Sequence, residues 1–284
     1  MKNNLHKVIV IVGPTASGKS DLAVHLAKQI GGEIISADSR QVYKGLNIGS
    51  GKITQKEMGG VRHHMLDVAN PRKVYSVEQY AKEAKKAVAE IIARKRVPII
   101  AGGTGFYIEA LIEGTSLPEV PPDKALREKL AKKTTEQLFT MLSKLDKTRA
   151  KSVDKKNRVR LIRAIEIAEK LGKVPKRKSK KNFDAYYIGV ATNTEMLKAK
   201  IAKRLKARMK AGMLAEAKLL HKQGLSWKRM RELGLEYRFM AEYLTGKMSK
   251  QEMLEKLEIA INQYAKRQMT WFKRNKEIQW VSLS

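Results

Sequence analysis

The sequence predicts an α/β fold of the P-loop NTPase type: a parallel sheet with helices on both faces, interrupted by an all-helical insertion. A β-branched run at residues 8–12 leads directly into a glycine-rich loop and a helical pattern. Strand-like and helical segments then alternate up to residue 114, as in doubly wound parallel sheets. Residues 123–181 contain only helical, Lys- and Arg-rich sequence, and a strand-like run returns at 185–190.

The glycine-rich loop matches the pattern G-x-x-x-x-G-K-[ST]. In this pattern, backbone N–H groups and the N-terminus of the next helix converge on phosphate oxygens. The lysine adds a charge, and the final hydroxyl can bind Mg²⁺. A chance match is the alternative, but the strand before and the helix after the loop argue against it. The predicted diphosphate site comprises Gly13, Pro14, Thr15, Ala16, Ser17, Gly18, Lys19 and Ser20, with Ser20 as the metal ligand.

Two further strands are expected before the insertion. Residues 33–38 form a short apolar run that ends in Asp38, and 97–101 form a buried strand followed by a turn rich in glycine. Ligands of open α/β sheets bind at the carboxyl ends of the strands, so Asp38 should lie near the phosphate loop. A capping box at 76–79 predicts the start of the helix between these strands.

The proline-rich stretch 117–122 marks a boundary. We therefore expect a core formed by residues 1–122 and 182–284, and a helical subdomain at 123–181 that ends in a flexible basic loop, 176–181. Apolar residues at helical spacing should line a small bundle: Leu126, Leu130, Leu138, Leu142, Leu161, Ile165 and Ala168. After residue 194 the chain reads as helix, with a second capping box at 249–252.

The composition points to a polyanionic partner. Lys and Arg number 59 against 28 Asp and Glu, a formal charge of +31. Nucleic acid is the first partner to expect and an anionic membrane surface the second, although part of the excess can be an ordinary solvated surface. No run of about 20 apolar residues is present, and cysteine is absent. With no room for a signal peptide before the first strand, we expect a cytoplasmic protein. A monomer is the default expectation for its oligomeric state.

The residues leave two chemical readings open. The third strand ends in Ala101-Gly102, without the Mg²⁺-holding Asp common in NTP hydrolases. Asp38 can be the base of a small-molecule kinase. Alternatively, the loop holds a diphosphate leaving group, and Asp38 takes a proton from a nucleophile that attacks the attached carbon. An adenine amine attacking an allylic carbon suits a weak carboxylate base, because the amine becomes acidic as the bond forms. An Asp that only caps a turn is the bland alternative.

Five motifs together resemble the bacterial tRNA dimethylallyltransferases, also called tRNA isopentenyltransferases, over nearly the whole chain. They are GPTASGKS at 13–20, ISADSRQVYKG at 35–45, HHMLD at 63–67, GGTGFY at 102–107 and YAKRQMTWF at 264–272. The resemblance implies transfer of a dimethylallyl group from dimethylallyl diphosphate to N6 of the adenosine 3′-adjacent to the anticodon of tRNA. It also implies that Mg²⁺ is required and that the anticodon arm is the binding partner.

The resemblance further implies roles for individual residues. Asp38 matches the base, Thr104 a residue that assists at the reacting amine, and Arg204 an arginine on the diphosphate. Asp38 and Thr104 also match family residues that contact tRNA. The other positions of this chain that match such residues are Ser39, Arg40, Gln41, Arg127, Val159, Arg160, Leu161, Ile162 and Arg163. The alternative for Arg127, Arg160 and Arg163 is an ordinary solvated helix charge. Trp271 is expected to pack in the core rather than to stack on a base.

The segment 232–238 and the adjacent histidines His63 and His64 are two further features of the sequence. The family's A-I-G-Y-[KR]-E segment is altered here to ELGLEYR at 232–238, so its contacts with RNA are expected to differ. His63 and His64 are adjacent, so in a strand their side chains diverge; we expect hydrogen bonding or stacking in the core rather than a metal pair. The runner-up functions are a P-loop kinase of a metabolite or nucleoside and an RNA-binding protein with a vestigial nucleotide fold.

Overall fold

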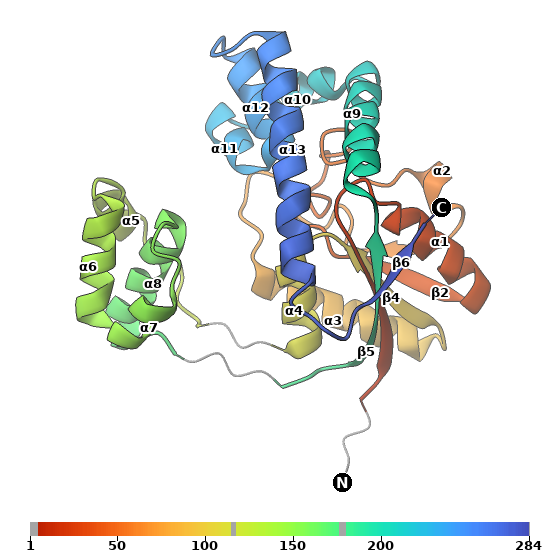
Figure 1. Ribbon diagram of the computed structural model, residues 1–284, viewed down its shortest axis with the longest axis horizontal. Coiled ribbons are helices and arrows are strands. Elements are labelled where there is room, and N and C mark those ends of the chain that lie inside the picture. Colours follow the sequence, from red (N-terminus) through yellow and green to blue (C-terminus); the bar gives the residue numbers. More distant parts are fainter. Residues whose placement is uncertain (1–4, 115–117, 176–179, 284) are drawn as a thin grey trace. The chain divides into compact units, whose positions relative to one another are not determined.

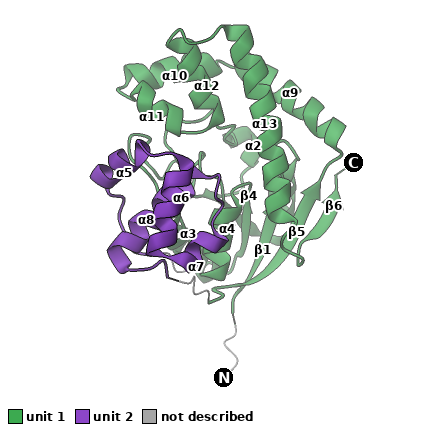
Figure 2. Ribbon diagram, turned by 60° about the vertical axis from the view of Figure 1, so that its left-hand side comes forward, with its two compact units in different colours: residues 1–114, 180–284 green, residues 115–179 purple. Residues whose placement is uncertain are grey.

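The structure is a computed structural model that describes residues 5–114, 118–175 and 180–283. The chain forms two compact units, shown in Figure 2: unit 1 comprises Met1–Gly114 and Lys180–Ser284, and unit 2 comprises Thr115–Ser179. Most of the basic loop expected at 176–181 lies outside the described residues. In the described ranges, no helix combines the length and the apolarity needed to cross a lipid bilayer.

Unit 1 is built on a six-stranded sheet in the order β3-β2-β4-β1-β5-β6 (Figure 1). All five neighbouring pairs are parallel, which confirms the predicted fold class. Because β1 lies between β4 and β5, the loop that follows it opens where the chain switches from one side of the sheet to the other. The strands are β1 (Lys7–Val12), β2 (Gly32–Ser36), β3 (His63–His64), β4 (Val97–Gly102), β5 (Asp184–Ala191) and β6 (Gln279–Ser282).

Helices cover both faces of this sheet because successive strand residues point to opposite sides. Ile11 of β1 packs with α1 (Lys19–Ile30) on one face. Val10 and Val12 face the other, larger core. That core is closed by α3 (Val77–Ala93), α4 (Gly105–Glu113) and α13 (Lys250–Phe272). Both faces are therefore buried, which explains why the strands read as continuous apolar runs rather than alternating ones.

The remaining helices of unit 1 lie largely beyond the carboxyl ends of the strands (Figure 1). They are α2 (Gln55–Met58), α9 (Thr194–Lys210), α10 (Met213–Lys222), α11 (Trp227–Glu232) and α12 (Leu235–Leu244). All of them except α2, which buries no residue, share the larger core through buried residues such as Met213, Met230 and Tyr237. This helical layer supplies arginine and glutamate side chains to the site described below.

Helix caps explain several boundaries. Ser76 and Gln79 form the predicted reciprocal capping box at the start of α3. At α13 only half of the expected box forms. Ser249 accepts the backbone N–H of Glu252, but the Glu252 carboxylate pairs with Lys256 at 2.5 Å instead of returning to the cap. A cation one turn along the helix competes with the backbone N–H for the same carboxylate.

Unit 2 is a small helical bundle with its own core. Its helices are α5 (Lys124–Ala131), α6 (Thr135–Leu145), α7 (Lys147–Ser152) and α8 (Arg158–Leu171). Asp123, Thr134, Asp146 and Asn157 cap their N-termini. The buried residues include six of the seven predicted core positions, namely Leu130, Leu138, Leu142, Leu161, Ile165 and Ala168, while Leu126 is partly buried.

Candidate active site

The phosphate loop joins β1 to α1 and turns back on itself before the helix begins. The N–H of Ser17 donates to the carbonyl of Pro14 at 3.3 Å. Gly18 is the N-cap of α1 with φ of 92°, a left-handed conformation that favours glycine. Glycine at the N-cap position provides no side-chain hydrogen bond to this helix end. The first N–H groups of α1 are thus directed at the pocket, as an anion site requires.

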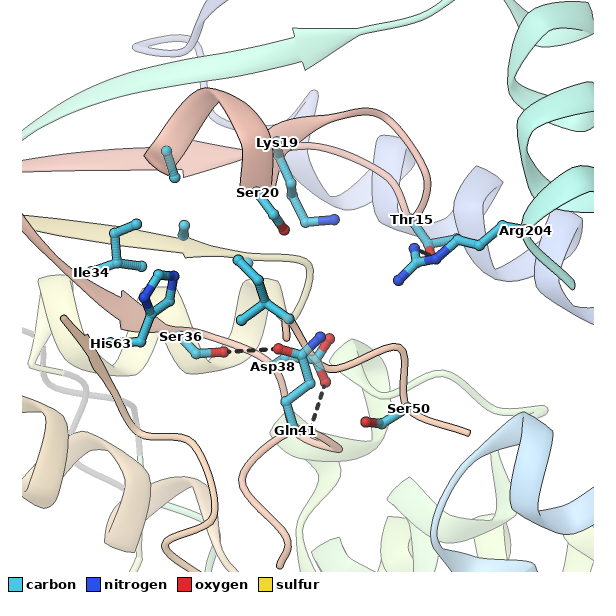
Figure 3. Close-up of a pocket in the computed structure, with 14 residues that line it drawn as sticks. Thr15, Lys19, Ser20, Ile34, Ser36, Asp38, Gln41, Ser50, His63 and Arg204 are labelled. Carbon is cyan, nitrogen blue, oxygen red and sulfur yellow. Dashed lines mark hydrogen bonds between the residues drawn. The ribbon is translucent and has the colours of Figure 1, made fainter. Parts of the chain in front are cut away.

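Lys19 and Ser20 lie on one side of the pocket that this loop borders (Figure 3). The ammonium of Lys19 donates to the carbonyl of Pro14 at 3.1 Å. Burial lowers the pKa of Lys19 to about 8, with a further contribution from the nearby charge of Arg204 and an opposing one from Asp38. An anion in the pocket would favour the charged ammonium and raise this pKa again.

Asp38 follows β2 by two residues and lies across the pocket from Lys19 and Ser20 (Figure 3). Its Oδ1 accepts the backbone N–H groups of Arg40 at 2.8 Å and Gln41 at 3.3 Å. The described residues place no hydrogen-bond donor on Oδ2. The turn-capping role and the role of a base are therefore compatible, because they use different oxygens of one carboxylate.

Thr104 ties the loop after β4 to the loop after β2. Its hydroxyl accepts the N–H of Ser39 at 3.0 Å and donates to the Ser39 hydroxyl at 3.4 Å. Its own N–H donates to the carbonyl of Ala37 at 3.0 Å. Tyr264 of α13 lies nearby, and burial together with the charge of Asp38 raises its pKa to about 12, so its phenol stays neutral. Thr104 is thus bonded to Ser39, the residue that directly follows Asp38.

Arg204 enters the pocket from α9 (Figure 3). One of its Nη atoms donates to the hydroxyl of Thr15 at 3.4 Å and the other to the carbonyl of Gly51 at 3.1 Å. Burial lowers the pKa of Arg204, and the adjacent Arg208 adds to that effect. A guanidinium remains charged even so. Lys19 and Arg204 therefore place two cations in one pocket, and a diphosphate would relieve their mutual repulsion.

Gln41 and Arg40 continue the loop after Asp38. The Gln41 amide donates to the carbonyl of Gly51 at 3.1 Å and accepts the hydroxyl of Ser36 at 3.4 Å, which holds it in the pocket wall. The guanidinium of Arg40 donates to the carbonyl of Glu232 at 3.4 Å. The altered segment 232–238 therefore contacts the loop that carries the predicted base.

Sequence reasoning missed Gln268 as a site residue. This buried glutamine of α13 accepts the N–H of Thr15 at 2.9 Å and donates to the carbonyl of Gly103 at 2.9 Å. It therefore fixes the phosphate loop to the loop that carries Thr104. Trp271, one turn further on, packs at the edge of the core beside Phe106 and below the guanidinium of Arg274. A polar residue on the core-facing side of α13 was the available signal for Gln268.

The tRNA-contact residues expected in the insertion lie together in unit 2. Arg127 donates two bonds of 2.7 Å to the carboxylate of Glu166, and Arg163 donates one of 3.4 Å. The Glu166 side chain is only 1% exposed, whereas those of Arg127 and Arg163 are 44% and 34% exposed. Both arginines are thus held by a buried anion and still reach solvent. Sequence reasoning gave no role to Glu166.

The other tRNA contacts expected in unit 2 differ in how far their side chains are exposed to solvent. Arg160 and Val159 are exposed on α8, and Ile162 is partly buried. Leu161 is fully buried in the core of unit 2, so its side chain cannot contact RNA and instead supports the helix. In the same way, the hydroxyl of Ser17 is buried away from solvent in the phosphate loop, so it does not line the pocket. Exposure cannot be read from a motif. The structure therefore limits the roles of these two side chains, while the assignment of both positions to the binding sites stays a prediction.

The adjacent histidines differ in their contacts. His64 Nε2 lies 2.7 Å from Glu33, which also accepts a two-pronged hydrogen bond from Arg94. The Arg94 guanidinium, with His64 beside it, lowers the pKa of Glu33 to about 2 despite its burial. His63 borders the pocket, and its Nδ1 lies 2.9 Å from the carbonyl of Val61. His64 thus forms the expected hydrogen bond within the fold.

The donor set fits a divalent cation that is carried chiefly by phosphate. The hydroxyl of Ser20 opens into the pocket (Figure 3). Within the described ranges, no group of three His, Cys, Asp or Glu side chains is placed to hold a metal. Mg²⁺ commonly keeps several waters and takes its remaining ligands from substrate phosphates. A hydroxyl beside a phosphate cradle is therefore sufficient protein ligation.

These features define an α/β protein of the P-loop class whose pocket places a phosphate cradle opposite a carboxylate. A family model described as IPP transferase matches residues 41–275. A tRNA dimethylallyltransferase of Treponema denticola is 43% identical over 97% of this chain and 96% of its own length. One from Syntrophus aciditrophicus is 41% identical over 99% of this chain and 94% of its own length.

Solved structures agree with these relatives. A tRNA isopentenylpyrophosphate transferase of Bacillus halodurans has a TM-score of 0.75 at 34% identity, covering 98% of this chain and 90% of that one. A eukaryotic dimethylallyltransferase described as acting on tRNA has a TM-score of 0.82 at 26% identity, covering 98% and 74%. The chain belongs to the tRNA dimethylallyltransferase family, which confirms the resemblance found in the sequence.

The lowered pKa of Lys19 predicts proton uptake when diphosphate binds. At pH 8.5 the free protein has much of Lys19 deprotonated, and the bound anion restores the ammonium; at pH 6.5 Lys19 is already charged. Calorimetry of inorganic diphosphate binding in buffers of different ionisation enthalpy should show more uptake by wild type than by Lys19→Arg at pH 8.5. The two should agree at pH 6.5. Equal uptake by both proteins at pH 8.5 would contradict the assignment.

Proposed function

We propose that this chain transfers the dimethylallyl group of dimethylallyl diphosphate to N6 of the adenosine 3′-adjacent to the anticodon of tRNA, releasing diphosphate. One observation carries the proposal: Asp38 lies across a single pocket from Lys19, Ser20 and Arg204. A cradle for the leaving group and a base for the nucleophile are thus held on opposite sides of the space where the new bond would form.

The chemical step follows from this arrangement. The N6 amine attacks the allylic carbon, and the bond from that carbon to the diphosphate oxygen breaks. One amine proton passes to Oδ2 of Asp38, whose other oxygen is occupied by the turn. Lys19 and Arg204 take up the negative charge that develops on the departing diphosphate. Thr104 and Ser39 brace the loop that carries the base.

Mg²⁺ would be held by the Ser20 hydroxyl together with phosphate oxygens and water, and when bound it neutralises charge on the diphosphate. The absence of a strand-end carboxylate on β4, which ends at Gly102, supports this arrangement over that of an NTP hydrolase. We further propose that the protein acts as a monomer.

Binding of the tRNA anticodon arm is assigned to arginines and to the loop after Asp38. Phosphate contacts position an RNA without reading its sequence. Arg160 is exposed, and Arg127 and Arg163 are oriented by Glu166, so unit 2 presents cationic side chains that are not fully neutralised. In unit 1, Ser39, Arg40 and Gln41 adjoin the base and are assigned to the target nucleotide. A loop base is unpaired, so its extrusion into the pocket costs little.

Replacing Arg160 should weaken tRNA binding through the loss of one phosphate contact. Arg160→Ala is expected to lower affinity uniformly among substrate tRNAs and to reduce the slope of log K against log salt concentration by about 1. Filter binding over a salt series measures both. Lys86→Ala, which removes an exposed cation of α3, is the matched control and should leave the slope unchanged. If both variants behave alike, Arg160 is a general surface charge.

The function is tested by incubation with labelled dimethylallyl diphosphate and bulk unmodified tRNA. The proposal expects label in the tRNA at a single adenosine and release of diphosphate. A parallel incubation with ATP and candidate nucleosides tests the kinase alternative. Transfer of the γ-phosphate without any label in tRNA would replace the proposal by that alternative.

A further inference from the structure

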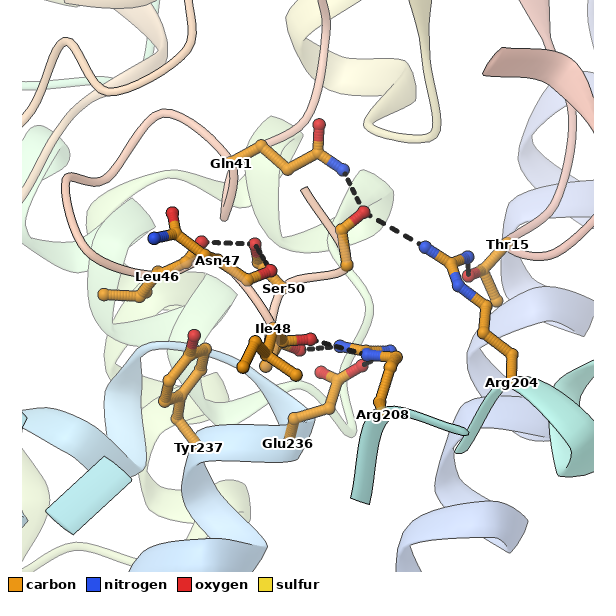
Figure 4. Close-up of polar contacts among 12 residues, drawn as sticks. Thr15, Gln41, Leu46, Asn47, Ile48, Ser50, Arg204, Arg208, Glu236 and Tyr237 are labelled. Carbon is orange, nitrogen blue, oxygen red and sulfur yellow. Dashed lines mark hydrogen bonds and ion pairs between the residues drawn. The ribbon is translucent and has the colours of Figure 1, made fainter. Parts of the chain in front are cut away.

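The loop formed by residues 46–52, here called the 46–52 loop, contacts three helices outside the sheet. Its backbone bonds to Arg208 of α9 and Glu216 of α10, and Gly49 lies against the ring of Tyr237 of α12. Figure 4 shows Arg208 and Tyr237 beside the loop. The loop also borders the reaction pocket through Ser50. None of these three side chains lines the pocket itself. Glu216 and Tyr237 therefore reach the reaction residues through the loop, whereas the charge of Arg208 also acts on Arg204 directly.

Glu216 holds one side of the loop. Its Oε2 accepts the N–H groups of Asn47 at 3.0 Å and Ile48 at 2.7 Å. Its Oε1 accepts the N–H of Gly49 at 2.9 Å and the phenol of Tyr237 at 2.7 Å. Four donors on a single carboxylate form strong, charge-assisted bonds. An amide in its place would turn an NH₂ group toward two of these donors.

Arg208 holds the carbonyl side of the same loop (Figure 4). Its guanidinium donates to the carbonyl of Ile48 at 2.6 Å and to the carbonyl of Gly49. It is kept in place by an ion pair with Glu236 at 3.4 Å. Glu236 and Tyr237 belong to the altered segment 232–238. That segment therefore reaches the 46–52 loop, in addition to contacting Arg40 through the carbonyl of Glu232.

Two glycines let the helices approach this closely. A Cβ on Gly49 would lie 2.5 Å from the ring of Tyr237, and one on Gly51 would lie 2.2 Å from the guanidinium of Arg204. Gly51 also has φ of 61°, which disfavours other residues. The loop backbone therefore lies between two sets of side chains. Glu216, Arg208 and Tyr237 contact it on one side, and Arg204 of the pocket contacts it at Gly51.

The far end of the loop meets the reaction residues directly. The carbonyl of Gly51 accepts bonds from Arg204 and from the side chain of Gln41, both at 3.1 Å. Arg204 also reaches Thr15 in the phosphate loop. A shift of the loop backbone would thus move the acceptor that orients Arg204. Displacements of about 1 Å in such a position are enough to alter binding and catalysis strongly.

We propose that Glu216, supported by Tyr237 and Arg208, is a positioning residue for the prenyl diphosphate: it fixes the 46–52 loop, and the loop fixes Arg204 over the leaving group. This inference rests on the proposed function. It assigns the segment 232–238 a part in binding the donor substrate, through Glu236 and Tyr237. It predicts that Glu216 influences donor binding only while Arg204 is present to be positioned.

The test is a double-mutant cycle on the binding of dimethylallyl diphosphate, measured by calorimetry on the full chain. Glu216→Gln keeps the size and shape of the side chain. When Arg204 is present, it is expected to weaken the affinity for dimethylallyl diphosphate about tenfold; in the Arg204→Ala background it should have almost no effect. Tyr237→Phe should give a smaller loss with the same dependence on Arg204. Glu242→Gln on α12 is the matched control; it removes the partner of Arg231 and Lys247 and should leave binding unchanged.

The outcomes separate cleanly. If wild type does not bind dimethylallyl diphosphate, the proposed function fails. If wild type binds and Glu216→Gln binds equally well, or if its loss is the same with and without Arg204, the positioning role is overturned. Should Glu216→Gln fold poorly, Tyr237→Phe carries the same comparison, because it removes one hydroxyl and leaves the carboxylate with its three backbone donors.

Discussion

Asp38→Asn lowers the turnover number by about 10²–10⁴ while tRNA affinity stays within about twofold of wild type, the usual effect of removing a general base. Asparagine can still accept the N–H groups of Arg40 and Gln41 with its Oδ1, so the turn after β2 should persist. It cannot take a proton from the amine. The loss therefore belongs to the chemical step and should appear in single-turnover rates of prenyl transfer.

Two comparisons make this result specific. Asp21→Asn removes an exposed carboxylate from the first turn of α1, beside the phosphate loop, and should retain full turnover. Asp38→Ala removes both the base and the turn contacts, so it should be at least as slow as Asp38→Asn. If Asp38→Asn turns over at the wild-type rate, Asp38 is only a turn residue.

The second large effect is expected for Arg204→Ala, which should lower kcat/KM for dimethylallyl diphosphate by about 10²–10³, the range seen when one group that stabilises transition-state charge is lost. Its guanidinium lies in the pocket wall beside Lys19, so it can follow the charge as it moves onto the diphosphate. Steady-state kinetics with saturating tRNA measure the ratio.

Charge alone should not restore the activity of this variant. Arg204→Lys keeps a cation but loses the planar guanidinium, whose two Nη atoms donate to Thr15 and to Gly51. This variant should therefore recover only part of kcat/KM. Lys206→Ala, an exposed position two residues along α9, is the control and should match wild type. Full activity of Arg204→Ala would remove Arg204 from the reaction.

The parts of the fold predicted from sequence were those coded locally. The run 8–12, the glycine loop and the periodic pattern of α1 are contiguous, so β1, the loop and α1 were found within one or two residues. The helices of unit 2 were likewise visible, since their apolar positions repeat at helical spacing and form their own core.

The strand β6 was not predicted, because the sequence after residue 194 reads as continuous helix. Gln279–Ser282 is short and mostly exposed, so it carries no buried apolar run. In the part of the chain that the structure describes, it pairs with β5 alone and lies at the sheet edge. A strand of this kind is defined by its neighbour rather than by its own residues.

The residues of the candidate site likewise fall into those that the sequence predicts and those that only the structure shows. Lys19, Ser20 and Asp38 follow strands whose carboxyl ends meet, so topology alone brought them together. Gln268 and Glu216 could not be assigned from the sequence, since they bond to loops 253 and 168 residues away, at Thr15 and Ile48. Arg127 and Arg163 were recognised as cations, but the buried Glu166 that holds both was visible only in the structure.

The central claim is that the phosphate cradle retains a leaving group while an RNA amine forms the new carbon–nitrogen bond opposite Asp38. The most direct measurement is single-turnover release of diphosphate from dimethylallyl diphosphate with two anticodon stem-loop RNAs. One carries adenosine 3′-adjacent to the anticodon, and the other carries purine riboside, which lacks the N6 amine. The account predicts rapid release, matched by prenylated RNA, only with adenosine. Equal release with both RNAs would contradict it.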